Sequence, residues 1–327
     1  MTIRPPRRPL LALAGTATTL LALTACASGT TDEPTTEAGL TTVRVSTLGF
    51  CDDPIVWGID QGIFADAGLD IELVTVESGA AGISALQADE IDLAYANPLT
   101  SLQAIENGVG LSVVSGSSLS NEDSYRLIVA ADSGIDTAAD LDGTTIAISA
   151  LGSLGEIMTA EWIAENGSGA TAEFVALPFA DQVPSVVGGT VAAAAVSFTQ
   201  AASALEEGTV VSLGNPYFDG VGEIPTSFYV GESGWVEENA AAAAAFAEAM
   251  NEVAASASDP ANDQARFEVT AAACGSTAED LAETAEPTYT GQLDADGVAA
   301  LIDILVEADA ISAIDVDEVL SDGARAE

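Results

Sequence analysis

Two side-chain types are absent from this 327-residue sequence: it contains no histidine and no lysine, and its 7 basic residues are all arginine. It therefore lacks the imidazole that most often serves as a general base and the amine that forms Schiff bases. A G-x-S-x-G motif and a set of zinc ligands are also missing. We expect no catalytic residue, no cofactor and no metal site, although a carboxylate pair could still support acid–base chemistry.

Negative charge, by contrast, is abundant. The 51 acidic residues give a formal net charge of −44, and beyond residue 26 only Arg44, Arg126, Arg266 and Arg325 are basic. Such a surface repels phosphates, which excludes nucleic acid as a partner, and it suits solubility outside the cell or in salt. It says little about a ligand, because charges are screened beyond about 8 Å at physiological ionic strength.

The first 26 residues have the features of an export signal, with three arginines before an uncharged stretch from Leu10 to Ala25. This stretch is too short and too rich in threonine for a transmembrane helix. It ends in the sequence LTAC, which resembles the lipobox of bacterial lipoproteins. The resemblance implies a signal peptide over residues 1–25 and a lipid on Cys26; the alternative is an ordinary cleaved signal. The arginine pair leaves the Sec and twin-arginine export routes both open.

Residues 26–41 are rich in Ser, Thr, Gly, Pro and acids, so we expect a flexible tether. The roughly 285 residues that follow are enough for two lobes. Short β-rich runs alternate there with helical patterns, as in βαβ units with parallel strands. We expect residues 42–130 and 226–327 to form lobe 1 and residues 131–225 to form lobe 2.

Three motifs resemble a known family. Residues 62–69 read GIFADAGL, residues 89–92 read DEID, and residues 141–147 read LDGTTIA. They are similar to motifs in the solute-binding proteins of ABC importers for sulfonates, taurine, nitrate and thiamine pyrimidine precursors, and the resemblance covers nearly all of residues 41–320. It implies an α/β, two-lobed periplasmic-binding-protein-like fold, in which each lobe is a mainly parallel sheet flanked by helices and two crossing strands join the lobes.

The resemblance also implies a function. The chain would be the lipid-anchored, extracytoplasmic component of an ABC importer, at the outer face of the cytoplasmic membrane, and would capture a small polar or anionic organic solute between its lobes. Its partners would be that solute, an ABC permease and the bilayer, and we expect a monomer. The alternatives are a surface interaction or sensor module on the same fold and, less favoured, an enzyme of the pyrimidine-synthase type.

The candidate ligand-binding residues lie where predicted strands end. In an open parallel sheet the ligand crevice lies beyond the carboxyl ends of the strands, where helix N-termini offer free N–H groups even without lysine. The residues at or near such positions are Phe50, Asp52, Asp53, Trp57, Ser78, Gly79, Asn97, Arg126, Gly152, Ser153, Ser197 and Thr199.

Most of these candidates have a structural alternative. One of Asp52 and Asp53 is expected to cap the helix that begins near Pro54. Lone aromatic residues such as Trp57 are commonly core residues. Arg126, the one base near the predicted cleft, could instead form a surface salt bridge.

Apart from Cys26, the chain has only Cys51 and Cys274. In an oxidising compartment an even pair can form a disulfide, but the sequence gives no distance between them. A disulfide and two separate buried thiols therefore both remain open.

Overall fold

The computed structural model describes residues 39–326. The proposed signal peptide, Cys26 and nearly all of the proposed tether lie outside the described residues. Within residues 39–326, none of the helices combines the length and the hydrophobicity that crossing a bilayer requires.

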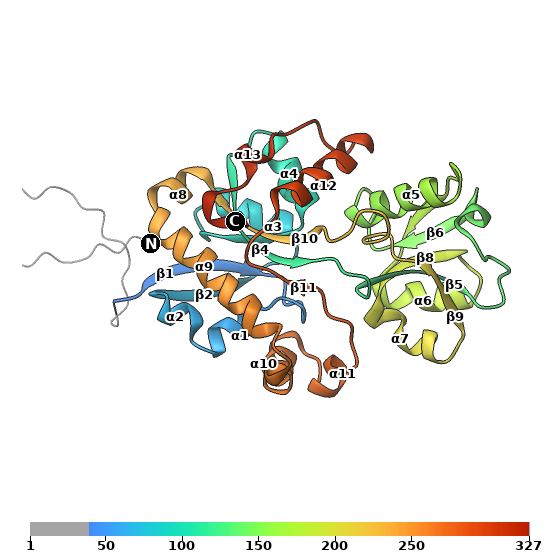
Figure 1. The fold of residues 1–327 in the computed structure, drawn as a ribbon, viewed down its shortest axis with the longest axis horizontal. Coiled ribbons are helices and arrows are strands. Elements are labelled where there is room, and N and C mark those ends of the chain that lie inside the picture. Colours follow the sequence, from blue (N-terminus) through green and yellow to red (C-terminus); the bar gives the residue numbers. More distant parts are fainter. Residues whose placement is uncertain (1–38, 327) are drawn as a thin grey trace, which may run out of the picture. The chain divides into compact units, whose positions relative to one another are not determined.

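The sheet of lobe 1 contains strands from both ends of the described chain (Figure 1). Its strands are β1 (Thr41–Thr47), β2 (Leu69–Thr75), β3 (Ala94–Ala96), β4 (Leu111–Leu119), β10 (Pro225–Glu232) and β11 (Thr288–Tyr289). β1 pairs with β2 in parallel, and a parallel bridge between Val45 and Leu93 places β1 beside β3. β10 lies antiparallel between β3 and β4, and β11 pairs with the far edge of β4.

Helices cover both faces of this sheet. They are α1 (Ile55–Asp60), α2 (Ile63–Asp66), α3 (Gly79–Gln87), α4 (Pro98–Glu106), α8 (Ser233–Glu238), α9 (Ala240–Ala257), α10 (Asp263–Cys274), α11 (Ala278–Ala282), α12 (Ala295–Glu307) and α13 (Val316–Val319). Neighbouring strand residues point to opposite faces, so Phe228 packs with α3, α4 and α12, whereas Tyr229 packs with α1, α2 and α9. The alanine-rich α9 buries Phe246 and Met250 against this second face.

Lobe 2 has a five-stranded sheet in the order β7-β6-β8-β5-β9. Its elements are β5 (Tyr125–Ala130), β6 (Thr145–Ile148), α5 (Leu154–Asn166), β7 (Glu173–Ala176), α6 (Phe179–Val187), β8 (Ala193–Ser197), α7 (Phe198–Glu206) and β9 (Val210–Gly214). β6 pairs in parallel with β7 and β8, whereas β5 runs antiparallel to β8 and β9. Because β5 pairs with lobe 2 strands, the chain leaves lobe 1 before Tyr125 and not after residue 130, where we expected the boundary.

Two segments connect the lobes, one between β4 and β5 and one between β9 and β10. They lie side by side, because the Ser120 N–H donates to the Ile224 carbonyl at 2.8 Å and the Ile224 N–H donates to Ser120 Oγ at 3.1 Å. The Asn215 side chain adds a hydrogen bond to the Asn121 carbonyl at 2.8 Å. This paired connection is the natural position of a hinge.

Candidate functional site

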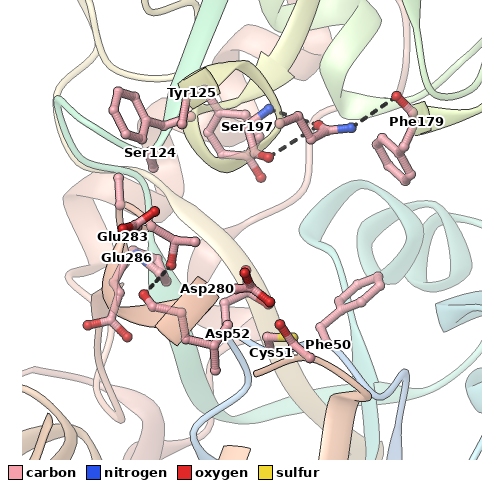
Figure 2. Close-up of a pocket in the computed structure, with 18 of the residues that line it drawn as sticks. Phe50, Cys51, Asp52, Ser124, Tyr125, Phe179, Ser197, Asp280, Glu283 and Glu286 are labelled. Carbon is pink, nitrogen blue, oxygen red and sulfur yellow. Dashed lines mark hydrogen bonds between the residues drawn. The ribbon is translucent and has the colours of Figure 1, made fainter. Parts of the chain in front are cut away.

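A cavity of about 1180 Å³ lies between the lobes (Figure 2). Lobe 1 contributes the loop after β1, the end of β4, the start of β10 and the segment 276–289. Lobe 2 contributes the start of β5, the N-terminus of α6 and residues along the whole length of α7. Phe50 and Asp52 lie on the lobe 1 side, and Tyr125, Phe179 and Ser197 lie across from them on the lobe 2 side. The cavity therefore forms where strand ends of both lobes meet, as predicted for this fold class.

A disulfide fixes the loop after β1. Cys51 is bonded to Cys274 at the end of α10, and their Cα atoms are 5.2 Å apart. The loop turns at Gly49, whose φ of 68° is easy only for glycine, and the Gly49 N–H donates to Thr47 Oγ1. Phe50 and Asp52, the neighbours of Cys51, are thereby held beside the segment that follows α10.

Asp53 belongs to the wall and does not line the cavity. Its side chain is 2% exposed and accepts hydrogen bonds from the Tyr229 hydroxyl at 2.6 Å and from the Ile55 N–H at 3.2 Å. Burial raises the pKa of Asp53 to about 6, although the Tyr229 hydrogen bond opposes that shift. Its role is to anchor the start of α1 to β10.

Asp52 points into the cavity (Figure 2) and is reached by solvent there. Among residues 39–326, the hydrogen bond found on its carboxylate comes from its own backbone N–H, and no other residue donates to it. The surrounding walls reduce its hydration, and this desolvation raises its pKa; the Glu286 carboxylate adds to the shift. Solvent in the open cavity limits both effects. Asp52 is therefore available to a ligand.

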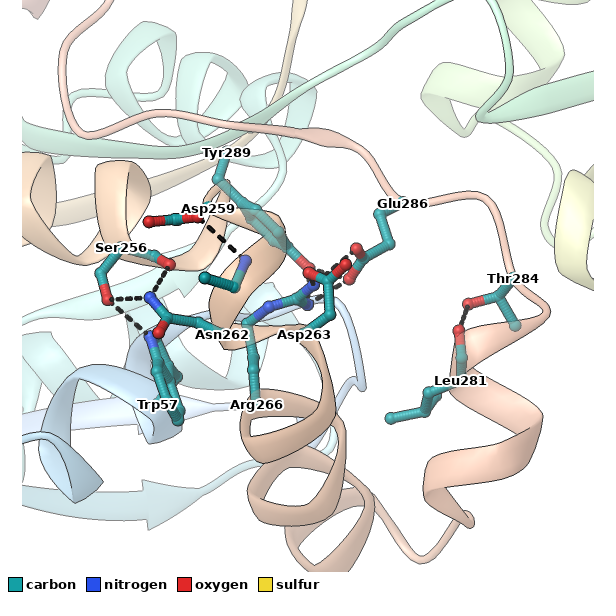
Figure 3. Close-up of polar contacts among 11 residues, drawn as sticks. Trp57, Ser256, Asp259, Asn262, Asp263, Arg266, Leu281, Thr284, Glu286 and Tyr289 are labelled. Carbon is teal, nitrogen blue, oxygen red and sulfur yellow. Dashed lines mark hydrogen bonds and ion pairs between the residues drawn. The ribbon is translucent and has the colours of Figure 1, made fainter.

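Glu286, on the same wall, is already neutralised (Figure 3). Arg266, whose side chain is 3% exposed, donates from both terminal nitrogens to its carboxylate, with 2.7 Å from Nη2 to Oε2. Arg266 Nη2 also contacts Asp263 at 3.0 Å, and the Tyr289 hydroxyl donates to Glu286 Oε1 at 2.8 Å. This buried arginine thus supports the cavity wall from behind.

Several predicted residues have structural roles instead. Trp57 is 2% exposed in the core and donates to Ser256 Oγ at 3.0 Å. Ser78 caps α3 by accepting a hydrogen bond from the Ala81 N–H, and Gly79 is the first residue of that helix. Asn97 caps α4 by accepting a hydrogen bond from the Thr100 N–H. Each cap satisfies a helix N–H group that has no partner within the helix. None of these side chains lines the cavity.

Arg126 does not offer its guanidinium to the cavity. Nη1 donates to the carbonyls of Glu122 and Tyr125 at 2.6 and 2.7 Å, and Nη2 donates to Asp123 at 2.9 Å. The group also lies 5.3 Å from the centre of the Phe198 ring. The salt-bridge alternative therefore describes Arg126 in this structure, and a role as anion anchor stays a prediction that these contacts do not favour.

The remaining lobe 2 candidates divide between helix caps and the cavity. The Gly152 N–H donates to Glu156 at 2.6 Å, and Ser153 caps α5 by accepting the Glu156 N–H. Ser197 lines the cavity and caps α7. Its side chain accepts a hydrogen bond from the Gln200 N–H, and its own N–H donates to the Gln200 side chain. The Thr199 side chain lies outside what the structure describes.

Sequence reasoning missed several lining residues: Tyr125 and Phe179 in lobe 2, and Asp280, Glu283 and Glu286 in the segment after α10. The cysteine pair was the available signal for the last three, because a bond from Cys51 to Cys274 brings that segment to the first loop.

The cavity lining contains five acidic residues and no arginine. This does not favour the anionic solute considered above. Within the described residues, no group of three or more acidic or cysteine side chains is arranged to hold a metal ion.

Comparison with known proteins identifies the family. The family model described as NMT1/THI5 like matches residues 53–262, more than half of the chain. No curated protein matches the sequence.

Three solved structures illustrate the fold. The periplasmic aliphatic sulphonate binding protein SsuA from Escherichia coli aligns with a TM-score of 0.72 at 20% identity, covering 88% of this chain and 94% of that one. The alkanesulfonate-binding protein SsuA from Xanthomonas axonopodis pv. citri, bound to MOPS, gives 0.66 at 18% identity, with 87% and 98% covered. The nitrate-binding protein NrtA from Synechocystis PCC 6803 gives 0.66 at 14% identity, with 86% of each chain covered.

These likenesses confirm the expected α/β periplasmic-binding-protein-like fold. All three motifs lie inside the region that the family model matches, two of them in lobe 1 and one in lobe 2. The match therefore confirms the resemblance that was based on them. The chain therefore belongs to the NMT1/THI5-like family.

Proposed function

We propose that this protein is the extracytoplasmic solute-binding component of an ABC-type importer, and that it captures a small polar organic solute between its lobes. The observation that carries the proposal is the cavity of about 1180 Å³ between two lobes that are joined by paired crossing segments. It exceeds the 300–1,000 Å³ of most ligand sites, as an open form would. Rotation about the crossings would bring the lobe 2 wall onto Phe50 and Asp52.

Binding alone accounts for the lining residues. Asp53, whose pKa burial raises to about 6, lies behind the wall, and the chain has no imidazole or lysine to pair with the carboxylates that line the cavity. The names of the three similar proteins also describe binding proteins. A permease that recognises the closed form would then take the solute.

The test is a thermal-shift screen of the mature protein, followed by calorimetry and small-angle scattering. A solute that binds the native state at 100 times its Kd stabilises it by about 2.7 kcal/mol, and closure should reduce the radius of gyration. Ala202→Trp would place an indole in the cavity and should abolish binding, whereas Ala65→Trp, on the exposed side of α2, should not. If no small solute binds and no closure occurs, the chain is an interaction or sensor module instead.

We also propose that Cys26 carries the lipid that holds the protein at the membrane. Cys26→Ser should release a protein that binds its solute with unchanged affinity but no longer supports uptake. Membrane retention and uptake equal to the wild type would contradict this assignment.

A further inference from the structure

The cavity combines acidic side chains with exposed aromatic rings. In the described residues, the Asp52 carboxylate on one wall accepts no hydrogen bond from another residue, and aromatic rings stand exposed on both walls. The acids restrict the charge of the ligand, and the rings restrict its shape.

The acids that line the cavity make the site negative. Glu286 is compensated by Arg266, and Asp280 accepts the Thr277 hydroxyl at 2.6 Å as part of the α11 cap. Among the described residues, Asp52, Glu206 and Glu283 have no such partner from another residue, and no arginine lines the cavity to supply one. Of these three acids, Asp52 is the one on the same loop as the exposed Phe50. Arg126, the arginine of lobe 2, uses its terminal nitrogens on neighbouring residues of its own segment. A ligand that enters as an anion therefore meets only like charge, whereas a cation meets a free carboxylate.

The shape of the site is set by two phenylalanines. Phe50 in lobe 1 is 50% exposed and Phe179 in lobe 2 is 59% exposed, and both line the cavity. Phe50 meets Tyr95 only edge-on, with 6.5 Å between ring centres. The other lobe 2 rings are already covered, since Tyr125 stacks on Tyr217 at 4.0 Å and Phe198 faces Arg126.

Large apolar rings cost free energy when they stay in water. Two of them on opposite walls of one cavity are therefore placed to pack on a ligand when the lobes close. The faces of aromatic rings also attract organic cations, with the strongest effect where water is excluded.

Building on the function proposed above, we propose that the solute is an organic cation, namely a protonated amine on a flat aromatic body, with Asp52 as its counter-ion and Phe50 and Phe179 packed against the body. The ligand is thus positively charged, in contrast to the sulfonate and nitrate named for the similar solved structures.

The proposal is tested with three probes that share a phenyl body: 2-phenylethylamine, 2-phenylethanol and 3-phenylpropanoate, which are a cation, a neutral molecule and an anion at pH 7. Calorimetry on the mature protein should give the order amine, then alcohol, then carboxylate, from tightest to weakest. A hydrogen bond to a charged group contributes about 1.5–3 kcal/mol, so Asp52→Asn should weaken the amine roughly 10- to 150-fold and leave the alcohol unchanged.

Matched variants separate the two parts of the site. Asp60→Asn removes an exposed acid on α1 that does not line the cavity, and it should leave the affinity for the amine unchanged. Phe179→Ala should weaken the amine and the alcohol together, whereas Val187→Ala, at the exposed far end of the same helix, should weaken neither. Thermal melts of each variant establish that it is folded.

An amine that binds no better than the alcohol, or whose affinity survives Asp52→Asn, would overturn the cation assignment. Taurine, ethanesulfonate and nitrate are measured beside the three probes. If one of these binds and the amine does not, the cation assignment fails while solute capture stands. If no solute of either group binds, the proposed transport function fails with it.

Discussion

Breaking the bond between Cys51 and Cys274 should lower both stability and ligand affinity. The two residues are 223 positions apart. The chain-entropy relation assigns about 5 kcal/mol to closing a loop of that length, and native disulfides typically contribute 2–4 kcal/mol. Taking about 3 kcal/mol, and about 2–4 °C per kcal/mol for a domain of a few hundred residues, the melting temperature should fall by about 6–12 °C.

Calorimetric melts of three samples test this expectation: the oxidised wild type, the wild type with a reductant, and the Cys51→Ser/Cys274→Ser variant. A mature form lacking Cys26 is used, so the reductant acts on this one pair. The reduced wild type controls for the serine substitutions, and both altered samples should melt together. Two free thiols in the oxidised protein, or three equal melting temperatures, would refute the reasoning.

Two further predictions concern buried contacts outside the cavity lining. Because the pKa of Asp53 is raised from 3.8 to about 6, the folded protein binds more protons than the unfolded chain between these values, so this carboxyl makes stability fall as pH rises through that window. In urea titrations from pH 4 to 7, the unfolding free energy of Asp53→Asn should therefore decrease less with pH than that of the wild type, by up to about 3 kcal/mol over the range. The same pH dependence in both proteins would contradict this. In lobe 2, a Cβ at Gly214 would lie 2.3 Å from the Trp162 ring, so Gly214→Ala should cost about 1–3 kcal/mol in the same titrations. Gly110→Ala, with open space around it, is the control, and equal stability of the two variants would show that the ring can move.

The fold could be predicted because its signals are local. The alternation of β-rich runs with helical patterns follows from periodicities that each segment carries itself. The position of Asp53 at the start of α1 and the cap at Asn97 follow from the same local chemistry. The direction and partners of β5 do not, since they depend on pairing with β8 and β9, whose residues lie more than 60 positions away.

The site could be predicted only in part, for a related reason. Strand ends indicate which loops face a crevice, and this correctly placed Phe50, Asp52 and Ser197 along the cavity. They do not indicate which loops converge, so Ser78 was included and Phe179 was missed. Neither could the sequence show that the donors of Arg126 are used by its neighbours Glu122 and Asp123.

The insertion of β10 between β3 and β4 has a consequence for how the protein forms. Residues 125–214 supply every strand of lobe 2 in one continuous piece, which can fold as soon as it emerges. Lobe 1 must wait, because its central strand is made more than 100 residues after β4. Until then β3 and β4 have open edges, which are prone to pair with other chains. The lobe whose first strands are synthesised earliest is therefore completed last.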